Sequence, residues 1–189
     1  IAAWYDADAG AIAAVSGPGG EGEPSWIDGT PAPLDGSDVG RHAAVSVTDE
    51  GAVTVVYQDV VDGRVLAARQ GADGGAWDIE SVHDGLVSGG LHALGTGVAL
   101  SRLPDGHEVA TYGDGTTGEL WLAARDGEGC WHHALALSPG TWIWPDVVTT
   151  GDGRVGVASV RLGLDASLSP QRELRSITVS APSGSCSSP

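Results

Sequence analysis

Three aspartates recur at a regular spacing and are the first candidates for chemistry. Asp6, Asp59 and Asp114 each follow an aromatic residue by two positions and precede a glycine by four positions. Carboxylates repeated in this way could hold cations, but an aspartate at the end of a strand also accepts hydrogen bonds from the backbone N–H groups of its own turn. Because an active site is usually built once, the repetition favours a turn-forming role.

The stretch from Asp6 to Gly10 also resembles half of a calcium-binding loop. Asp6 and Asp8 offer hard oxygen ligands two positions apart, a spacing that can converge on Ca²⁺. The equivalent turns after Asp59 and Asp114 lack the second aspartate, and no glutamate follows at the distance of a bidentate ligand. Calcium at Asp6 and Asp8 is therefore the minor interpretation, and the sequence implies no other cofactor.

Histidines offer a second set of candidates. His132 and His133 lie beside Cys130, a grouping of residue types that bind metals. Adjacent residues of a strand point to opposite faces, so the two imidazoles cannot easily bind one ion. We interpret both as surface or turn histidines. His42 and His92 remain as candidates for contact with a ligand.

The segment Trp142-Ile143-Trp144-Pro145 is the aromatic cluster that least resembles the repeats. On a strand, Trp142 and Trp144 would face the same side and offer a platform for sugar rings or for the apolar surface of a partner. Pro145 predicts an edge or a loop. The sequence favours the alternative, packing between repeats. No pair of carboxylates stands out as a catalytic acid and base, so no catalytic residue is assigned.

The two cysteines are Cys130 and Cys186. In an exported chain such a pair is typical of one disulfide, which here would hold the tail Ser183–Pro189 against the body. Two buried free thiols, or a bridge to another chain, are the alternatives.

The elements that position these residues repeat along the chain. Trp4 and Tyr57 lie 53 residues apart, and Tyr57 and Tyr112 lie 55 residues apart. Each repeat has a strand, an Asp/Gly turn, a strand ending in aromatic-x-Asp, a turn, an Ala-rich strand, and a last strand after a tryptophan. A period of roughly 50 residues built from short strands predicts β-propeller blades and not helical repeats. The tryptophans expected at equivalent packing positions are Trp26, Trp77 and Trp131.

We predict an all-β fold, an arc of about 3.5 four-stranded blades that is part of a larger ring. The first unit lacks its first strand and the fourth lacks its last, so we expect another chain or another copy to complete the propeller. The blades are expected over residues 1–182 and a polar tail over 183–189. The four units lie at about 1–36, 37–90, 91–143 and 144–182.

Composition narrows the partners and the compartment. The 189 residues carry a formal net charge of −16 and include no lysine. A protein with this negative charge repels the phosphate backbones of nucleic acids, so no nucleic-acid partner is expected. No apolar run approaches the roughly 18 residues that a membrane span needs. The acidic surface, and a start inside a strand-like run, favour a secreted or cell-surface protein trimmed from a longer product.

The frame of Tyr-x-Asp, Gly, Ala-Arg and Trp resembles the blades of secreted bacterial β-propeller proteins, loosely the sialidase-like repeat superfamily. The resemblance implies a ring of about six to eight blades, export, and often a ligand or sugar site near the ring axis. The turn nearest to the Asp-box of that superfamily, Val47–Gly51, lacks the serine and the tryptophan. No arginine triplet and no Tyr–Glu pair can be assigned as a sialidase site, so the resemblance does not carry sialidase activity over to this chain.

Three functions remain open at this point. The first is a non-catalytic module for binding or assembly outside the cell or on its surface, with a glycan or protein ligand. The second is part of an extracellular glycoside hydrolase or lyase whose carboxylates come partly from other blades. The third is a structural subunit of a larger surface complex. Repeated scaffold residues and the lack of a catalytic motif favour the first.

Overall fold

The structure is a computed structural model that describes residues 1–15, 22–29, 38–87 and 89–184. These residues form β-strands β1 to β16 and no helix, so the predicted all-β class is confirmed. The chain divides into unit 1, Ile1–Gly95, and unit 2, Thr96–Pro189. No helix in the described part of the chain is long and apolar enough to cross a membrane.

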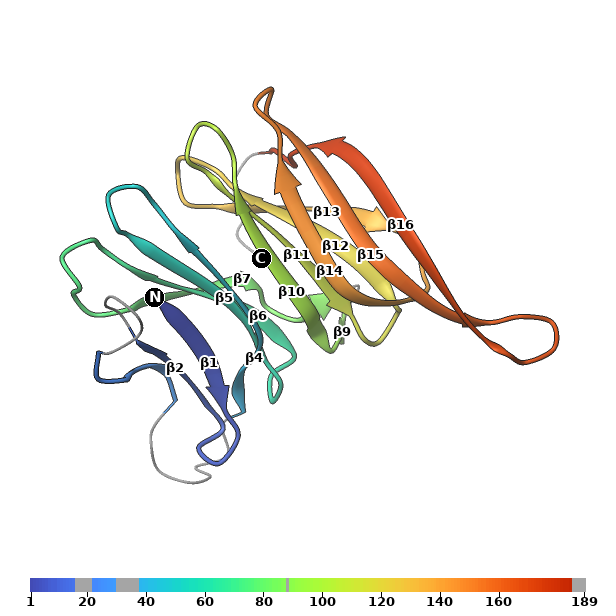
Figure 1. Ribbon diagram of the computed structural model, residues 1–189, viewed down its shortest axis with the longest axis horizontal. Coiled ribbons are helices and arrows are strands. Elements are labelled where there is room, and N and C mark those ends of the chain that lie inside the picture. Colours follow the sequence, from blue (N-terminus) through green and yellow to red (C-terminus); the bar gives the residue numbers. More distant parts are fainter. Residues whose placement is uncertain (16–21, 30–37, 88, 185–189) are drawn as a thin grey trace. The chain divides into compact units, whose positions relative to one another are not determined.

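Unit 1 contains two antiparallel sheets in which neighbouring strands follow each other in sequence (Figure 1). One sheet has the order β1-β2-β3, the other has the order β4-β5-β6-β7, and β8 pairs with β9 in a short ribbon. The strands are β1 (Ala2–Asp6), β2 (Ala11–Val15), β3 (Ser25–Asp28), β4 (Val39–Val47), β5 (Val53–Asp59), β6 (Arg64–Gln70), β7 (Asp78–His83), β8 (Leu86–Val87) and β9 (Gly90–Leu91).

Unit 2 is built in the same way, from a four-stranded and a three-stranded sheet. The four-stranded sheet has the order β10-β11-β12-β13, and the three-stranded sheet has the order β14-β15-β16. The paired part of β15 and β16 continues past the start of β14, so this hairpin extends beyond its own sheet (Figure 1). The strands are β10 (Leu94–Arg102), β11 (Glu108–Asp114), β12 (Glu119–Arg125), β13 (Trp131–Leu137), β14 (Thr141–Thr149), β15 (Arg154–Leu164) and β16 (Pro170–Ser180).

Each unit has a core formed between its two sheets. In unit 1, Ile12 of β2 packs with Val55 and Tyr57 of β5, and all three are fully buried. The hydroxyl of Tyr57 donates a hydrogen bond to Oδ2 of Asp28 at 2.8 Å, which ties the two sheets together. Burial, and then the charge of Asp28, raise the pKa of Tyr57, so its hydroxyl keeps the proton that it donates.

The core of unit 2 joins β11 and β12 to the three-stranded sheet. Val109 and Leu120 pack with Val155 and Val157 of β15, and each side chain is at most 1% exposed. Apolar burial of this kind is the dominant stabilising contribution in a small β-domain.

The three repeated aspartates lie at the ends of β1, β5 and β11, where the sequence places them. Oδ1 of Asp6 accepts hydrogen bonds from the N–H groups of Asp8 and Ala9, and Oδ1 of Asp114 accepts two equivalent bonds from Thr116 and Thr117. Oδ1 of Asp59 accepts the N–H of Asp62. The turn-forming interpretation is therefore confirmed.

Trp77 and Trp131 hold equivalent positions in their sheets, but Trp26 does not, which corrects the prediction for Trp26. Trp131 lies opposite Arg125, eleven residues after the repeated aspartate, whereas Trp26 lies opposite Ala13, seven residues after it. Trp77 directly precedes β7 and packs on the core of unit 1. Trp77 directly precedes Asp78 as Trp131 directly precedes His132, and the pairing partners of Asp78 and His132 both lie ten residues after the repeated aspartate. The register shifts at the same place in all three sheets, so this shift does not account for the position of Trp26.

Candidate functional site

β4, β10 and β14 are the first strands of their sheets, and each leads into a hairpin turn of the same type. In each turn the N–H of the first residue donates to the carbonyl four positions later, and the glycine three positions later donates back to the first carbonyl. The shared bonding pattern aligns the three strands residue by residue. The first residues of the turns are Thr48, Leu103 and Thr150.

A left-handed residue stands six positions before each of these turns. The residues are His42, Gly97 and Trp144, with φ values of 50°, 107° and 51°. The pairing registers of β4 and β14 shift at this point, so each strand forms a bulge. We call His42, Gly97 and Trp144 the bulge positions.

Left-handed backbone is costly for a histidine or a tryptophan, by about 1–2 kcal/mol. Such strain persists only where the surrounding structure imposes it, and strained residues gather at functional sites. His42 is exposed, and the side chain of Trp144 is 70% exposed. The fold therefore holds the backbone fixed at these positions while it presents the side chains to solvent.

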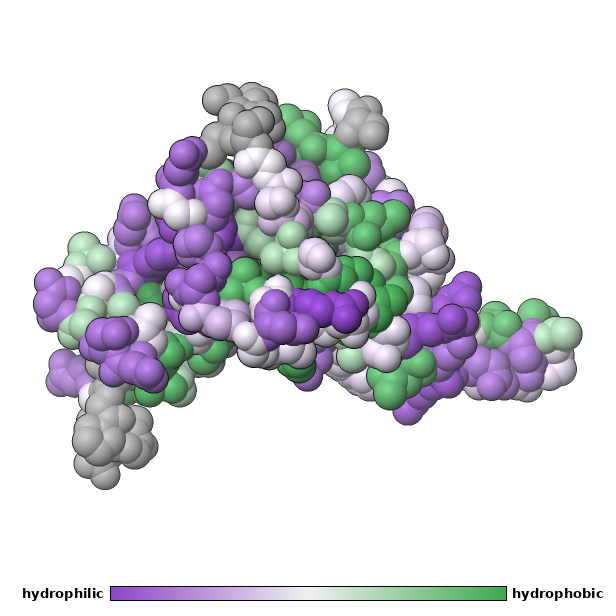
Figure 2. Space-filling model, turned by 90° about the horizontal axis from the view of Figure 1, so that it is seen from above, coloured by the Kyte–Doolittle hydropathy of each residue, from purple (hydrophilic) through white to green (hydrophobic). Residues whose placement is uncertain are grey.

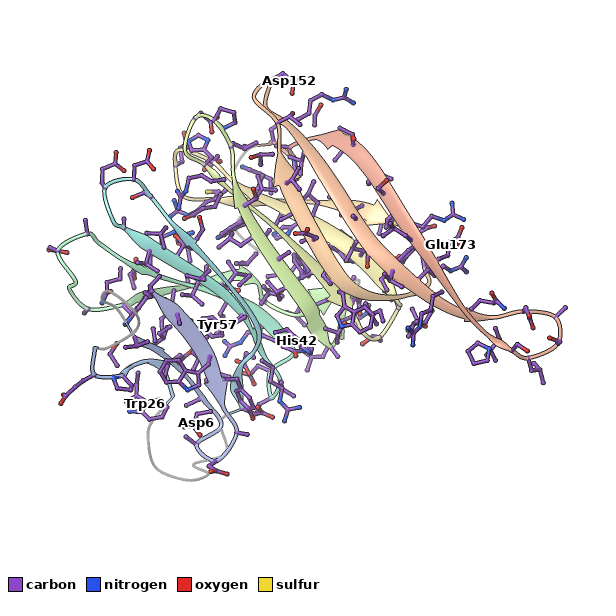
Figure 3. The ribbon with its side chains drawn as sticks, in the orientation of Figure 1. Asp6, Trp26, His42, Tyr57, Asp152 and Glu173 are labelled. Carbon is purple, nitrogen blue, oxygen red and sulfur yellow. The ribbon has the colours of Figure 1, made fainter. Side chains whose placement is uncertain are left out.

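In unit 1 an ionic cluster holds the bulge at His42. Arg41 forms a salt bridge of 2.9 Å with Asp38, and Asp38 also accepts the hydroxyl of Tyr5 at 2.8 Å. The guanidinium of Arg41 lies 5.4 Å from the ring centre of Tyr5, a cation–π contact. Figure 3 labels His42 on β4, beside Tyr57 of the neighbouring strand.

The electrostatics at this bulge favour a neutral imidazole. Partial burial, and then the nearby charge of Arg41, lower the pKa of His42 from its ordinary value of 6.5. A neutral imidazole has one donor and one acceptor nitrogen, so His42 can exchange hydrogen bonds with hydroxyl groups of a ligand.

In unit 2 the bulge of β14 touches β10 at Gly97. A Cβ atom at Gly97 would lie 2.7 Å from Cδ of Pro145, which is closer than real Cβ contacts allow. Glycine at 97 thus permits the close approach that places Trp144 and Pro145, and its positive φ suits it to the position.

The prediction that Trp142 and Trp144 share one face is wrong. The register shift between Ile143 and Asp146 interrupts the alternation of side chains on which the prediction rested. Trp142 packs against the core of unit 2, and its Nε1 donates to the carbonyl of Ser138 at 2.9 Å. Trp144 alone of the pair is widely exposed.

His92 lies in a loop that packs on the turn between β5 and β6. Its N–H donates to the carbonyl of Gly85 at 2.9 Å, and a Cβ atom at Gly63 would lie 2.2 Å from its carbonyl oxygen. This close backbone contact places His92 at a turn and not at a bulge position.

The pair His132 and His133 points to opposite sides of β13, as adjacent strand residues must. Nε2 of His132 lies 2.6 Å from Oδ2 of Asp126, and Nδ1 of His133 lies 2.9 Å from the hydroxyl of Tyr112. The expectation of surface histidines is wrong, because the side chain of His132 is only 10% exposed and His133 is half-buried.

Hydrogen bonds to Asp126 lower the pKa of its carboxyl group. The hydrogen bond from His132, and then the N–H of Cys130, lower the pKa of Asp126 to about 2. Cys186 lies outside the described residues, so the Cys130–Cys186 disulfide stays a prediction.

The described residues contain no group of three or more His, Cys, Asp or Glu side chains arranged to hold a metal ion. Oδ1 of Asp6 is already bonded to two backbone N–H groups. Calcium at Asp6 and Asp8 stays a prediction.

No protein-family model matches this chain, and no curated protein does.

Proposed function

We propose that this chain is an extracellular or cell-surface β-propeller module that binds a ligand and does not catalyse a reaction. The four sheets correspond to an arc of about 3.5 four-stranded blades of a larger ring. The ligand contacts are the side chains at the bulge positions, His42 and Trp144. The favoured ligand is a glycan, and a protein surface is the second candidate.

One observation carries this proposal: a fixed backbone combined with varied side chains. The bulge positions have a positive φ in three sheets but carry histidine, glycine and tryptophan. The turn aspartates, in contrast, are the same residue in three repeats because they serve the scaffold. Variation on a constant frame is what a binding surface requires.

The chemistry of the two side chains suits a sugar. An exposed indole offers an apolar face with a polar N–H, which can stack on the C–H face of a pyranose ring. A neutral imidazole exchanges hydrogen bonds with hydroxyl groups. Trp144 is 70% exposed, so its indole is accessible to a ligand.

A glycan array with matched variants tests the proposal. We expect the wild-type chain to bind a defined set of glycans and the Trp144→Gly variant to lose this binding. Glycine stands at the equivalent position 97, so the variant keeps a residue that the scaffold accepts. Trp131→Phe is the control, because Trp131 lies outside the bulges. Equal glycan binding by wild type and Trp144→Gly would show that the bulges do not bind glycans.

A further inference from the structure

The outward face of the last sheet is uncovered among the described residues. β5 and β11, the second strands of the four-stranded sheets, are buried along their whole length. β15 holds the same place in its sheet, but buried residues alternate with partly exposed ones from Val155 to Val160. The buried set faces the core of unit 2, so the other set faces away from it.

This outward face carries exposed apolar side chains among polar ones. Leu174 of β16 lies opposite Val160 of β15, and Val148 of β14 lies opposite Gly156. Leu174 is 73% exposed and Val148 is 53% exposed. In Figure 2 the same hairpin extends to the right and carries apolar residues in green beside purple polar ones. Large apolar side chains exposed together on one sheet face mark a surface made for contact. Its other apolar members are Ala158, Leu162 and Leu164.

The first sheet carries an aromatic face of its own. Ala13 lies opposite Trp4 on one side and opposite Trp26 on the other, so the three form a row across the sheet. The row lies on the face opposite Ile12 and Ala14, which pack into the core of unit 1. Trp4 is 37% exposed and Trp26 is half-buried.

The two faces belong to segments of different charge. Residues 1–40 contain seven acidic residues and no basic one. Residues 141–180, which hold β14 to β16, contain four of the nine arginines and four acidic residues, and Arg154 and Arg172 lie on the outward face with Asp146. In a chain of net charge −16 this segregation is pronounced, and opposite charges guide and select the contact between two surfaces.

We propose that a second copy of this chain packs the outward face of its β14–β16 sheet against the Trp4–Ala13–Trp26 row of the first copy. The leucine and valine side chains cover the indole rings, and Arg172, on the same face as Leu174, lies near the acidic residues of the first sheet. The contact is head-to-tail, because it joins two different surfaces. It goes beyond the proposed ligand binding and uses surfaces other than the bulge positions.

Light scattering on a size-exclusion column tests the contact on the full chain. We expect the wild-type protein to elute as a particle of two or more chains of 19.0 kDa each. Leu174→Asp and Trp4→Arg, each alone, should give monomers, because each destroys one of the two faces. Leu168→Asp is the matched control, since Leu168 is an equally exposed leucine of the same hairpin but lies in its turn.

Mixing the two variants gives the sharpest outcome. The Leu174→Asp chain keeps an intact first sheet and the Trp4→Arg chain keeps an intact last sheet, so an equimolar mixture should form pairs. A wild-type protein that stays monomeric at every concentration overturns the proposal, and so does a mixture that stays monomeric. Circular dichroism verifies that both variants fold. Arg172→Glu changes the charge at an exposed position and should weaken the assembly. This variant replaces Leu174→Asp or Trp4→Arg as the test if either of them unfolds. The measured quantity is the particle mass. A chain that stays monomeric can still bind glycans, and a chain that assembles can fail to bind them, so the two proposals are tested separately.

Discussion

Comparing glycine with alanine at position 144 tests the strained bulge directly. Both substitutions remove the indole and its contacts, so the difference between the two variants isolates the backbone. The left-handed conformation costs alanine about 1–2 kcal/mol, and glycine pays about 0.5–1 kcal/mol in backbone entropy. Because φ at 144 is 51°, Trp144→Gly should be more stable than Trp144→Ala by about 1 kcal/mol.

The same comparison at an ordinary position of β14 should have the opposite sign. Val148 is exposed, and its φ is not in the left-handed region. Val148→Gly should therefore be less stable than Val148→Ala by about 0.5–1 kcal/mol. Urea unfolding of the four variants, followed by circular dichroism, measures both differences. If alanine is the more stable residue at both positions, the bulge holds no strain and the reasoning fails.

Further predictions concern the core, the acid range and the cysteines. Tyr57→Phe removes the hydrogen bond to the Asp28 carboxylate and should cost about 1.5–3 kcal/mol in urea unfolding, and a loss near zero would show that the two sheets are not tied there. The pKa of Asp126 falls from 3.8 to about 2 on folding, so its contribution to stability is present above pH 3.8 and disappears as the pH falls toward 2. Wild type should therefore lose more stability than Asp126→Asn between pH 5 and pH 2, and equal losses in the two proteins contradict this. Thiol labelling of the unreduced, denatured exported protein should find no free thiol at Cys130 or Cys186, and two labelled cysteines reject the bridge.

The parts of the fold that follow from local sequence were predictable. An Asp four positions before a glycine forms a turn through its own carboxylate and backbone, so Asp6, Asp59 and Asp114 could be assigned without any tertiary contact. The hairpins after β4, β10 and β14 likewise follow from their Asp and Gly residues.

Register and bulges could not be predicted, because packing between sheets decides them. Nothing in the sequence near His42 or Trp144 marks a left-handed residue, since neither is a glycine. The one local signal was Gly97 at the equivalent position, and the aligned turns were needed to interpret it. The register of the last strand, which gives Trp26 and Trp131 different partners, is decided in the same way.

The hydrogen-bond partners of the histidine pair could not be predicted from the sequence either. The rule of alternating faces correctly separates His132 from His133. The partners themselves, Asp126 and Tyr112, lie 6 and 21 residues away, and only the pairing of β11, β12 and β13 brings the second one into contact.

A crystal structure of the assembled particle is the most direct test of the central claim, that these sheets are propeller blades whose first strands present a ligand site. We predict a closed ring in which β4, β10 and β14 line the axis and the bulge positions face it, with the last sheet of one copy against the first sheet of the next. Sheets stacked as a sandwich, or first strands at the outer rim of a ring, would contradict the account.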